Sequence, residues 1–246
     1  MKIIIKSKKL SLIYLDTETT DITAGARLVQ LAHKEATGGQ LVNEYFKPPV
    51  PISFSSMAAH HITNEMVAQK PIFAGSQQQE ALKQILQDGI LVAHNASFDI
   101  LVLKNEGVKT RQYIDTLRVS RHLLDSEQYA LQYLRYFLGL NIKAQAHDAL
   151  GDVLVLEGLY QYLVILAAKR FGLKEQNEIT QKMLDLTQLP VVLENFNFGK
   201  YKGRPIGEVS EVDPGYLQWL YESETQRPLA EQNEDLVYTL KQYINL

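Results

Sequence analysis

The order of apolar runs along the chain restricts its fold more than any other feature of the sequence. A short β-branched run at 10–16, LSLIYLD, precedes two further runs, RLVQLAHKEA and LVNEYFKP, which Gly38 and Gly39 join as a predicted hairpin. Helical patterns then alternate with extended ones such as ILVAHN. An antiparallel start followed by this alternation predicts an α/β fold with a mixed sheet flanked by helices.

Capping signals place the helices. The segment SQQQEALKQILQ begins with a capping box from Ser76 to Gln79 and ends before Gly89, so we expect one helix there and a shorter one in ITNEMVAQK. SFDILVLKNEG, DTLRVSRHLL and ALQYLRYFLGL predict three more, the first with Ser97 as its N-cap. A long helix is expected from 148 to 171.

A change of composition after residue 171 indicates two domains, and a chain of 246 residues has room for them. Residues 8–171 form the expected α/β domain, the polar stretch 172–189 is interpreted as a linker, and 190–246 is expected to be a small α+β module. Trp219, with Tyr216 and Leu220 at helical spacing, is expected in the core of that module.

Charge and composition exclude several classes of protein. The 25 basic and 28 acidic residues give a formal net charge of −3, which argues against a histone-like coating of nucleic acid. The absence of cysteine excludes disulfides, thiolate zinc sites and a cysteine nucleophile. No apolar run reaches the roughly 18 residues of a membrane span, and the first residues lack the features of a signal peptide. We therefore expect a cytoplasmic protein with no membrane partner.

Asp16 and Glu18 lie two residues apart at the end of the first apolar run. Side chains at this spacing share one face of a strand, about 6.6 Å apart along it, and two such carboxylates can hold a divalent metal. A charge at the end of an apolar strand must be paired, bound to metal or placed at a cleft. Asp125 and Glu127 repeat the Asp-x-Glu pattern in a polar connection, where we expect solvated loop charges.

Two further segments place acids near the starts of predicted helices. In AHNASFD, Asp99 falls in the first helical turn after a strand, where it either complements the helix dipole or faces a site. In HDALGD, Asp148 is the expected N-cap and Asp152 lies one turn inside the helix. Asp148 and Asp152 share a helix face and compete as ligands, whereas His147 reaches the same site only from the loop before the helix.

The candidate set of acids is Asp16, Glu18, Asp99 and Asp152. Their four negative charges balance two divalent cations, and hard oxygen ligands favour magnesium, with manganese as a substitute, over zinc. Two such ions about 4 Å apart clamp a phosphodiester, one activating the attacking water and the other stabilising the leaving oxygen. His147, neutral near pH 7, is the candidate base for the water proton.

Together these segments resemble the DEDDh 3′ to 5′ exonucleases, the group that contains the proofreading subunit of bacterial replicase. LDTETTD, AHNASFD and HDALGD match the three exonuclease motifs in order within residues 8–168, and HHIT at 60–63 resembles the family's substrate-contacting loop. The resemblance implies a ribonuclease-H-like fold, two magnesium ions at the four acids and His147 as general base. The residues implied to hold the terminal nucleotide are Thr17, Thr19, His60, Ile62, His94, Asn95 and Phe98. His61 departs from the glycine of many relatives.

The segment at 198–223, FGKYKGRPIGEVSEVDPGYLQWLYES, resembles the small C-terminal domain of the exodeoxyribonuclease X group. Lys200, Lys202 and Arg204, with Tyr201 interleaved, form a candidate nucleic-acid patch that would contact phosphates and stack a base. The alternative is a basic turn with structural glycines.

The leading hypothesis is a metal-dependent exodeoxyribonuclease that releases nucleoside 5′-monophosphates from DNA 3′ ends in repair or end processing. Two alternatives stay open. One is an exoribonuclease that trims RNA, because no motif here marks the 2′-hydroxyl contacts that separate the substrates. The other is a polymerase-associated proofreading subunit, and the string QLPVV at 188–192, which resembles a sliding-clamp peptide, is the motive for a replication or repair protein partner. Oligomeric state has no signal in the sequence.

Overall fold

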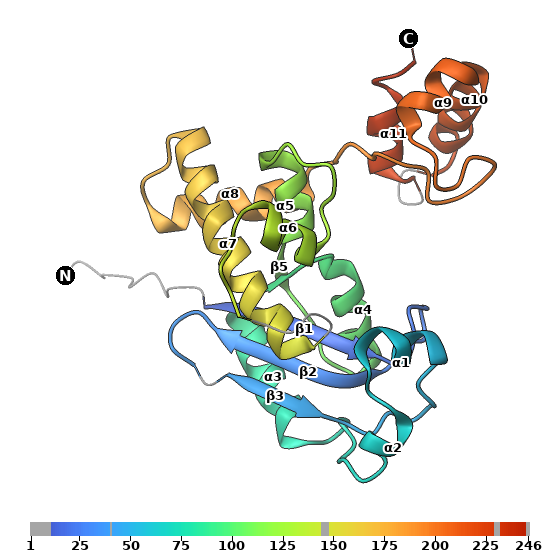
Figure 1. Ribbon diagram of the computed structural model, residues 1–246. Coiled ribbons are helices and arrows are strands. Elements are labelled where there is room, and N and C mark those ends of the chain that lie inside the picture. The colour runs from blue at the N-terminus through green and yellow to red at the C-terminus, as the bar shows by residue number, and fades with distance from the viewer. Residues whose placement is uncertain (1–10, 40, 144–147, 229–231, 245–246) are drawn as a thin grey trace. The chain divides into compact units, whose positions relative to one another are not determined.

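Among the residues that the structure describes, five strands form one mixed sheet (Figure 1). They are β1 (Leu12–Thr19), β2 (Leu28–Glu35), β3 (Val42–Tyr45), β4 (Ile90–Ala93) and β5 (Gln112–Asp115). Their order across the sheet is β3-β2-β1-β4-β5. β2 runs antiparallel to β1 and β3, whereas β4 runs parallel to β1 and β5. The predicted hairpin and mixed sheet are confirmed.

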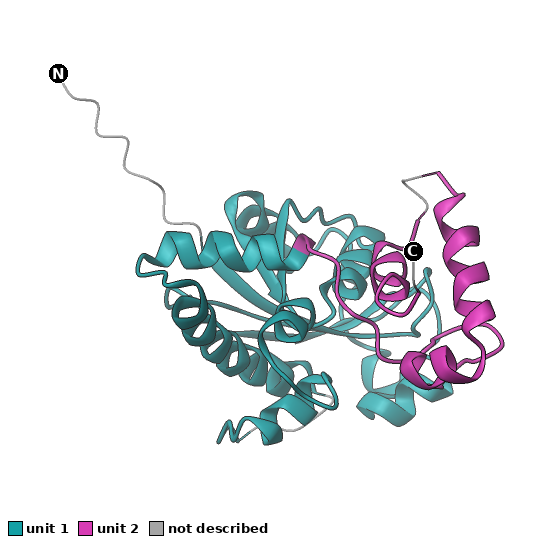
Figure 2. Cartoon of the chain, turned by 90° about the horizontal axis from the view of Figure 1, so that it is seen from above, with its two compact units in different colours: residues 1–187 teal, residues 188–246 magenta. Residues whose placement is uncertain are grey.

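The computed structural model describes residues 11–39, 41–143, 148–228 and 232–244. The chain divides into unit 1, residues 1–187, and unit 2, residues 188–246 (Figure 2). The helices of unit 1 are α1 (Phe54–His60), α2 (Asn64–Val67), α3 (Gln77–Asp88), α4 (Ala96–Asn105), α5 (Thr116–Leu123), α6 (Leu131–Phe137), α7 (Ala149–Phe171) and α8 (Gln176–Gln188). Those of unit 2 are α9 (Ile206–Val212), α10 (Pro214–Thr225) and α11 (Glu234–Leu240).

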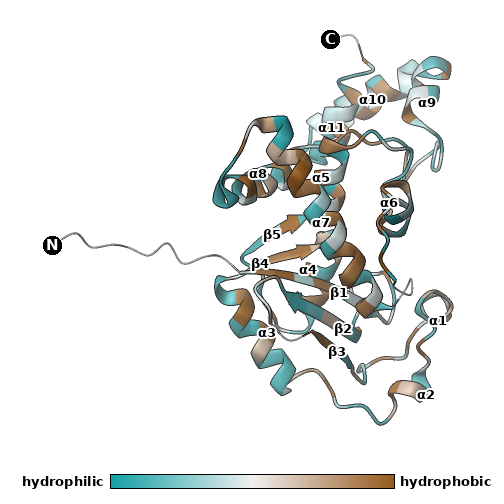
Figure 3. Ribbon diagram, turned by 60° about the vertical axis from the view of Figure 1, so that its left-hand side comes forward, coloured by the Kyte–Doolittle hydropathy of each residue, from teal (hydrophilic) through white to brown (hydrophobic). Residues whose placement is uncertain are grey.

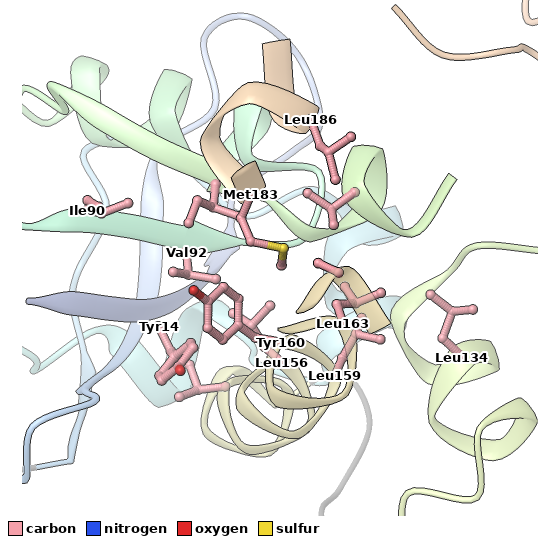
Figure 4. Close-up of a cluster of buried hydrophobic side chains, with 14 of the residues drawn as sticks. Tyr14, Ile90, Val92, Leu134, Leu156, Leu159, Tyr160, Leu163, Met183 and Leu186 are labelled. Atoms are coloured by element: carbon pink, nitrogen blue, oxygen red, sulfur yellow. The ribbon is translucent and has the colours of Figure 1, made fainter. Parts of the chain in front are cut away.

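Side chains of β1 alternate between two helical layers. Ile13 and Leu15 pack on one face of the sheet with apolar residues of α3 and α4. Tyr14 lies on the other face with residues of α5, α6, α7 and α8, and its ring meets that of Tyr160 edge-on at 5.6 Å (Figure 4). Strand β4 is apolar throughout and buried between both layers (Figure 3). The central strands are therefore rigid supports for whatever follows them at their carboxyl ends.

The segment 172–189 is not the predicted linker. Residues 176–188 form helix α8, in which Ile179, Met183 and Leu186 belong to the same core cluster as α7. These three side chains follow one another at helical spacing and cover one face of an otherwise polar helix. The Thr187 hydroxyl also accepts a hydrogen bond from the backbone N–H of Asp115, 3.0 Å away. Unit 1 therefore includes α8.

The described residues of unit 2 form a small helical module, which corrects the α+β prediction. Its three helices enclose a core of side chains such as Phe196, Val209 and Leu217. Extended pairing among its described residues is limited to an isolated bridge between Asn195 and Pro205. The apolar residues therefore pack helix on helix, with the glycine-rich turn lying beside them.

Helix α7 is long and apolar enough to cross a membrane by length and composition alone. Half of its apolar window is buried, however, and it packs across β1 and β2 as the main core helix of unit 1. Apolar character around a helix is expected when neighbours cover it on several sides. Helix α7 is thus accounted for by the core of unit 1.

Candidate active site

Asp16 and Glu18 lie on the same face of β1 as Tyr14 and point toward α7, which contributes Asp152. One carboxylate oxygen from each of these three acids lies within 4.8 Å of those from the other two. Alternation along a strand places the first two, and the first turn of a helix crossing the sheet places the third. The structure therefore brings together three of the four predicted acids as a candidate metal-binding group.

Asp99, the fourth acid, lies in the first turn of α4, after the carboxyl end of β4. It is 5% exposed, and its Oδ1 accepts a hydrogen bond from the Thr17 hydroxyl at 2.8 Å. Thr17 itself is on β1, between Asp16 and Glu18. The predicted substrate contact Thr17 is thus occupied in fixing the Asp99 carboxylate.

Burial and neighbouring acids raise the proton affinity of Asp16 and Glu18. Burial raises the pKa of Asp16 well above its usual range, and the charges of Asp99, Asp152, Glu18 and Asp148 raise it further. Burial likewise raises the pKa of Glu18 to about 8, and Asp152 and Asp99 add to the shift. The pKa of Asp99 rises to about 7 through burial, against the lowering effect of the Thr17 hydrogen bond. The site therefore holds more negative charge than its surroundings stabilise.

The start of α4 is held by Asp115, a residue that sequence reasoning missed. The N-cap of α4 is Asn95, in the left-handed region with φ 67°, and not Ser97. The Asp115 carboxylate accepts hydrogen bonds from the N–H groups of Asn95 at 3.0 Å and Ala96 at 3.2 Å. It also caps α5 through the N–H of Leu117. The only local signal was an aspartate at the end of a strand.

Two glutamines orient the acids of the third motif. Gln30, fully buried on β2, donates to Asp148 Oδ1 at 2.7 Å. Asp148 is the N-cap of α7 as predicted, but its side chain makes no capping bond and is held by this amide. The Gln132 amide of α6 donates to Asp152 Oδ1. Asp152 rather than Asp148 therefore joins Asp16 and Glu18 in the acidic group, which resolves the competition between them.

The HHIT loop is tied to the end of β1. His60 is buried, its Nε2 donates to the Thr19 carbonyl at 3.2 Å, and its Nδ1 accepts from the Ile62 N–H at 3.0 Å. Ile62, which the resemblance implies as a nucleotide contact, is 3% exposed and packs in a small core cluster. His61 ends α1 with φ 62°. Glycine adopts this left-handed conformation without strain, which agrees with the glycine that the resemblance leads us to expect here.

Both ring nitrogens of His94, which is partly buried, lie within hydrogen-bond distance of the chain. Its Nε2 lies 2.7 Å from the Tyr129 carbonyl, and its Nδ1 lies 2.9 Å from the Thr116 hydroxyl, which also donates to the Ala93 carbonyl at 3.1 Å. Burial lowers the pKa of His94 to about 4, so the ring is neutral near pH 7. Asn95 beside it is exposed, and Phe98 is half-buried against the core. His147 lies outside the described residues.

The predicted basic patch lies in unit 2. Tyr201 is partly buried there, and its hydroxyl donates to Asp213 Oδ2 at 2.7 Å, while Lys200 Nζ donates to the same oxygen at 3.0 Å. Lys202 and Arg204 are exposed. Asp125 and Glu127 are also exposed, as expected of solvated loop charges.

Comparison with known proteins identifies this arrangement. Residues 13–160 match the family described as Exonuclease, and this range contains all four acids. The chain belongs to the Exonuclease family. Residues 196–224 match the exodeoxyribonuclease X-like C-terminal domain, which covers the turn and helices α9 and α10 of unit 2. Both resemblances stated from the sequence are confirmed.

Individual relatives of this Exonuclease family chain agree with the assignment. It is 31% identical to Exodeoxyribonuclease 10 of Escherichia coli K12, over 94% of this chain and 97% of the relative. A solved structure of Exonuclease X in complex with 5′ overhanging duplex DNA is 28% identical, with a TM-score of 0.56, over 72% of this chain and 99% of that chain. E. coli Exonuclease I with a dT13 oligonucleotide is 16% identical, with a TM-score of 0.58 over 67% of this chain and 43% of that one. This last likeness concerns the fold alone.

Proposed function

We propose that the chain is a metal-dependent 3′–5′ exodeoxyribonuclease that releases nucleoside 5′-monophosphates from DNA 3′ ends, in repair or end processing. Membership of the Exonuclease family and 31% identity to an exodeoxyribonuclease over nearly the whole chain support the substrate class. The observation that carries the proposal is the convergence of Asp16, Glu18 and Asp152 oxygens within 4.8 Å beside buried Asp99.

The residues present fit a metal site. All the candidate ligands are carboxylate oxygens, the hard donors that magnesium and manganese prefer. The raised pKa values of Asp16 and Glu18 come first from burial and then from the charges of neighbouring acids, and a divalent cation at the same place would counter both. We propose magnesium as the physiological ion and manganese as a substitute. Two bound ions would supply an activated water and a stabilised leaving oxygen for an in-line displacement at phosphorus.

The chain's own residues then divide the remaining work. Asp16, Glu18 and Asp152 would hold the metal beside Asp99, while Thr17 fixes Asp99 and Gln132 fixes Asp152. His147 is proposed to take the proton of the attacking water. A bond forms between the water oxygen and phosphorus, the bond from phosphorus to the 3′ oxygen of the preceding nucleotide breaks, and that oxygen takes a proton from solvent water. The products are a nucleoside 5′-monophosphate and a strand with a new 3′-hydroxyl.

Contacts to the terminal nucleotide are proposed from groups that remain accessible at this edge of the sheet. Asn95 is exposed and Phe98 is half-buried, and we propose that the amide and the ring contact the nucleotide. The backbone around Thr17 and Thr19 is proposed to contribute as well. His60 and His94 would act by holding the loops that surround the site, since both ring nitrogens of each are engaged with the chain. A cytoplasmic location is part of the proposal.

The test compares wild type with Asp16→Asn on single-stranded DNA, duplex DNA and RNA labelled at the 5′ end, with magnesium or with excess chelator. The matched control is Asp125→Asn, which changes an exposed aspartate in the same Asp-x-Glu pattern. We expect a magnesium-dependent ladder of shortened DNA that Asp125→Asn keeps and Asp16→Asn loses. A DNA ladder that persists in Asp16→Asn would refute the proposed site. Faster trimming of RNA than of DNA would favour the exoribonuclease, and no ladder on any substrate would favour a partner-dependent subunit.

A further inference from the structure

The single tryptophan of the chain lies on the surface of unit 2 and not in its core, contrary to the prediction from spacing. Trp219 is 58% exposed on α10, whereas its neighbours Leu217 and Leu220 are buried. A tryptophan side chain is usually well buried, because leaving its large apolar ring in water forgoes the gain from burial. An exposed indole on a small module is therefore a candidate contact for another molecule.

The indole continues a series of packed aromatic rings. Trp219 lies against Tyr216 with ring centroids 5.7 Å apart, and Tyr216 meets Tyr201 edge-on at 5.1 Å. At Gly199, which has φ +71°, a Cβ atom would lie 2.7 Å from the Tyr216 hydroxyl, so only glycine allows the turn to approach this ring. The tyrosines are partly buried against the core of unit 2. The exposed ring of Trp219 is thus supported by a fixed aromatic base.

Positive charges border the same rings. The ammonium of Lys200 lies 4.7 Å from the centre of the Tyr201 ring, and the guanidinium of Arg204 lies 5.6 Å from it. Lys200 pairs with Asp213 at 3.0 Å and Arg204 with Glu208 at 3.6 Å, both in exposed pairs of the kind that contribute little stability. Lys202 is exposed and makes no ion pair with any residue that the structure describes. A phosphate can therefore compete for all three cations.

The combination of cations and aromatic rings on unit 2 favours single-stranded DNA as the ligand. Residues 188–246 contain nine acidic and five basic residues, so the net charge of unit 2 does not attract a polyanion. Attraction must come from the local cations together with stacking of bases on aromatic rings. Stacking needs a base whose face is free, which single-stranded DNA offers and a duplex does not.

We propose that unit 2 binds single-stranded DNA through an aromatic–basic surface on which Trp219 stacks a base and the neighbouring cations contact phosphates. The surface consists of Lys200, Tyr201, Lys202, Arg204, Tyr216 and Trp219. The inference deepens the proposed function, on which it rests for the identity of the polymer. It gives unit 2 the task of holding the substrate strand, separate from the acids of unit 1 that act on its 3′ end.

The first experiment uses Trp219 as its own probe. The full chain, in excess chelator so that no hydrolysis occurs, is titrated with a thymidine 20-mer while tryptophan fluorescence is recorded. Since the chain has one tryptophan, any change in emission reports on this surface. We expect saturable quenching by the oligonucleotide and a much weaker response to a fully paired, blunt duplex. Unchanged emission at saturating oligonucleotide and low salt would overturn the proposal and leave a protein partner as the occupant of the surface.

Affinity measurements with variants supply an independent readout. Binding of a labelled thymidine 20-mer is followed by anisotropy in Trp219→Leu, Trp219→Phe and Tyr238→Leu. We expect Trp219→Leu to weaken binding by about 5- to 150-fold, the usual effect of losing one stacked base, and Trp219→Phe to recover most of it. Tyr238 is an exposed aromatic residue on α11, outside the surface, so Tyr238→Leu should bind normally. Equal affinity of Trp219→Leu and wild type would overturn the proposal even if quenching occurs.

Two further measurements separate this inference from the proposed function. Lys202→Ala should reduce the slope of log affinity against log salt by about 0.7, as expected for one lost phosphate contact on a single strand. The p-nitrophenyl ester of thymidine 5′-monophosphate tests the acids of unit 1 without needing unit 2. We expect Trp219→Leu to keep wild-type kcat/KM on this ester while its KM on long single strands rises. If wild type shows no metal-dependent hydrolysis of either the ester or the DNA strand, the proposed function is refuted. If wild type and Trp219→Leu have equal KM values on long single strands, the proposed role of Trp219 is refuted.

Discussion

Crowding of acids at the candidate metal site predicts how stability depends on pH when metal is absent. The pKa of Glu18 is raised from 4.5 to about 8 in the folded chain. Between these values the folded state holds a proton that the unfolded state has lost. The contribution to stability is therefore complete below pH 4.5 and disappears as pH rises through 8.

The window from pH 6.5 to 8.5 separates the titration of the buried acids from that of the two buried histidines and of Tyr160. His33 and His94 have pKa values lowered to about 4 by burial, so their contributions change only between pH 4 and 6.5, in the opposite direction. Tyr160, with a pKa raised to about 12, changes only at higher pH. One group with a folded pKa of 8 contributes about 2 kcal/mol less at pH 8.5 than at pH 6.5. Because Glu18 is partly exposed, solvent screening reduces this to about 1–2 kcal/mol.

The assay is urea unfolding in excess chelator at the two pH values, followed by far-ultraviolet circular dichroism. Tryptophan fluorescence serves as an internal control, because Trp219 reports on unit 2 alone and its transition should stay constant. For wild type, we expect the free energy of unfolding of unit 1 to be lower at pH 8.5 than at pH 6.5 by about 1–2 kcal/mol or more, because Asp16 and Asp99 add to the effect of Glu18. In Glu18→Gln this decrease in unfolding free energy should be smaller, and in wild type with saturating magnesium it should disappear. An equal fall in Glu18→Gln and wild type would refute the reasoning.

Three other substitutions test the fold by thermal or urea unfolding. Glu106→Ala should lower the free energy of unfolding of unit 1 by about 2–4 kcal/mol. The Glu106 side chain is 3% exposed, and its carboxylate accepts two hydrogen bonds from Arg27 and one from the Leu28 N–H. A loss below about 1 kcal/mol would contradict this reasoning. Gly89→Ala should lower the free energy of unfolding by about 1–3 kcal/mol, because the new Cβ would lie 2.5 Å from the backbone oxygen of Ile85. Unchanged stability would show that the backbone at this turn moves to accommodate the methyl group. His61→Gly should raise the free energy of unfolding by about 0.5–1 kcal/mol, because glycine adopts the left-handed conformation of this residue without strain. A lower free energy of unfolding would indicate that the histidine side chain makes stabilising contacts instead.

Local patterns were sufficient to predict the parts of the site that lie on single elements. The two-residue spacing of Asp16 and Glu18 fixes a shared strand face, and the structure confirms it. The four-residue spacing of Asp148 and Asp152 likewise predicted a shared helix face, but it left open which of them joins the acids of β1. That choice depends on Gln30, which holds Asp148 from a strand more than a hundred positions earlier. A buried amide in an apolar strand carries no local sign of its partner.

The same limit explains the elements that sequence reasoning misassigned. Helix α8 looked like a linker because only three of its side chains, Ile179, Met183 and Leu186, form its core stripe, and their burial depends on α7. Trp219 has core-like spacing with Tyr216 and Leu220, but the spacing does not say how far the core extends around the helix. Asp115 was missed because capping two helices at once requires that β4 and β5 be neighbours. Each of these features is decided by tertiary contacts.

The donors that orient the acids reveal how the site keeps its charge available. Thr17 donates to Asp99, Gln30 to Asp148 and Gln132 to Asp152, and all three donors are neutral. A lysine or arginine in their place would orient the carboxylates equally well but would cancel the charge that a divalent cation needs. These three neutral donors fix the direction of the oxygens that they contact and do not themselves cancel the charge. The cost is seen in the raised pKa values of Asp16 and Glu18, which come first from burial and then from the charges of neighbouring acids, and a bound divalent cation would reduce it.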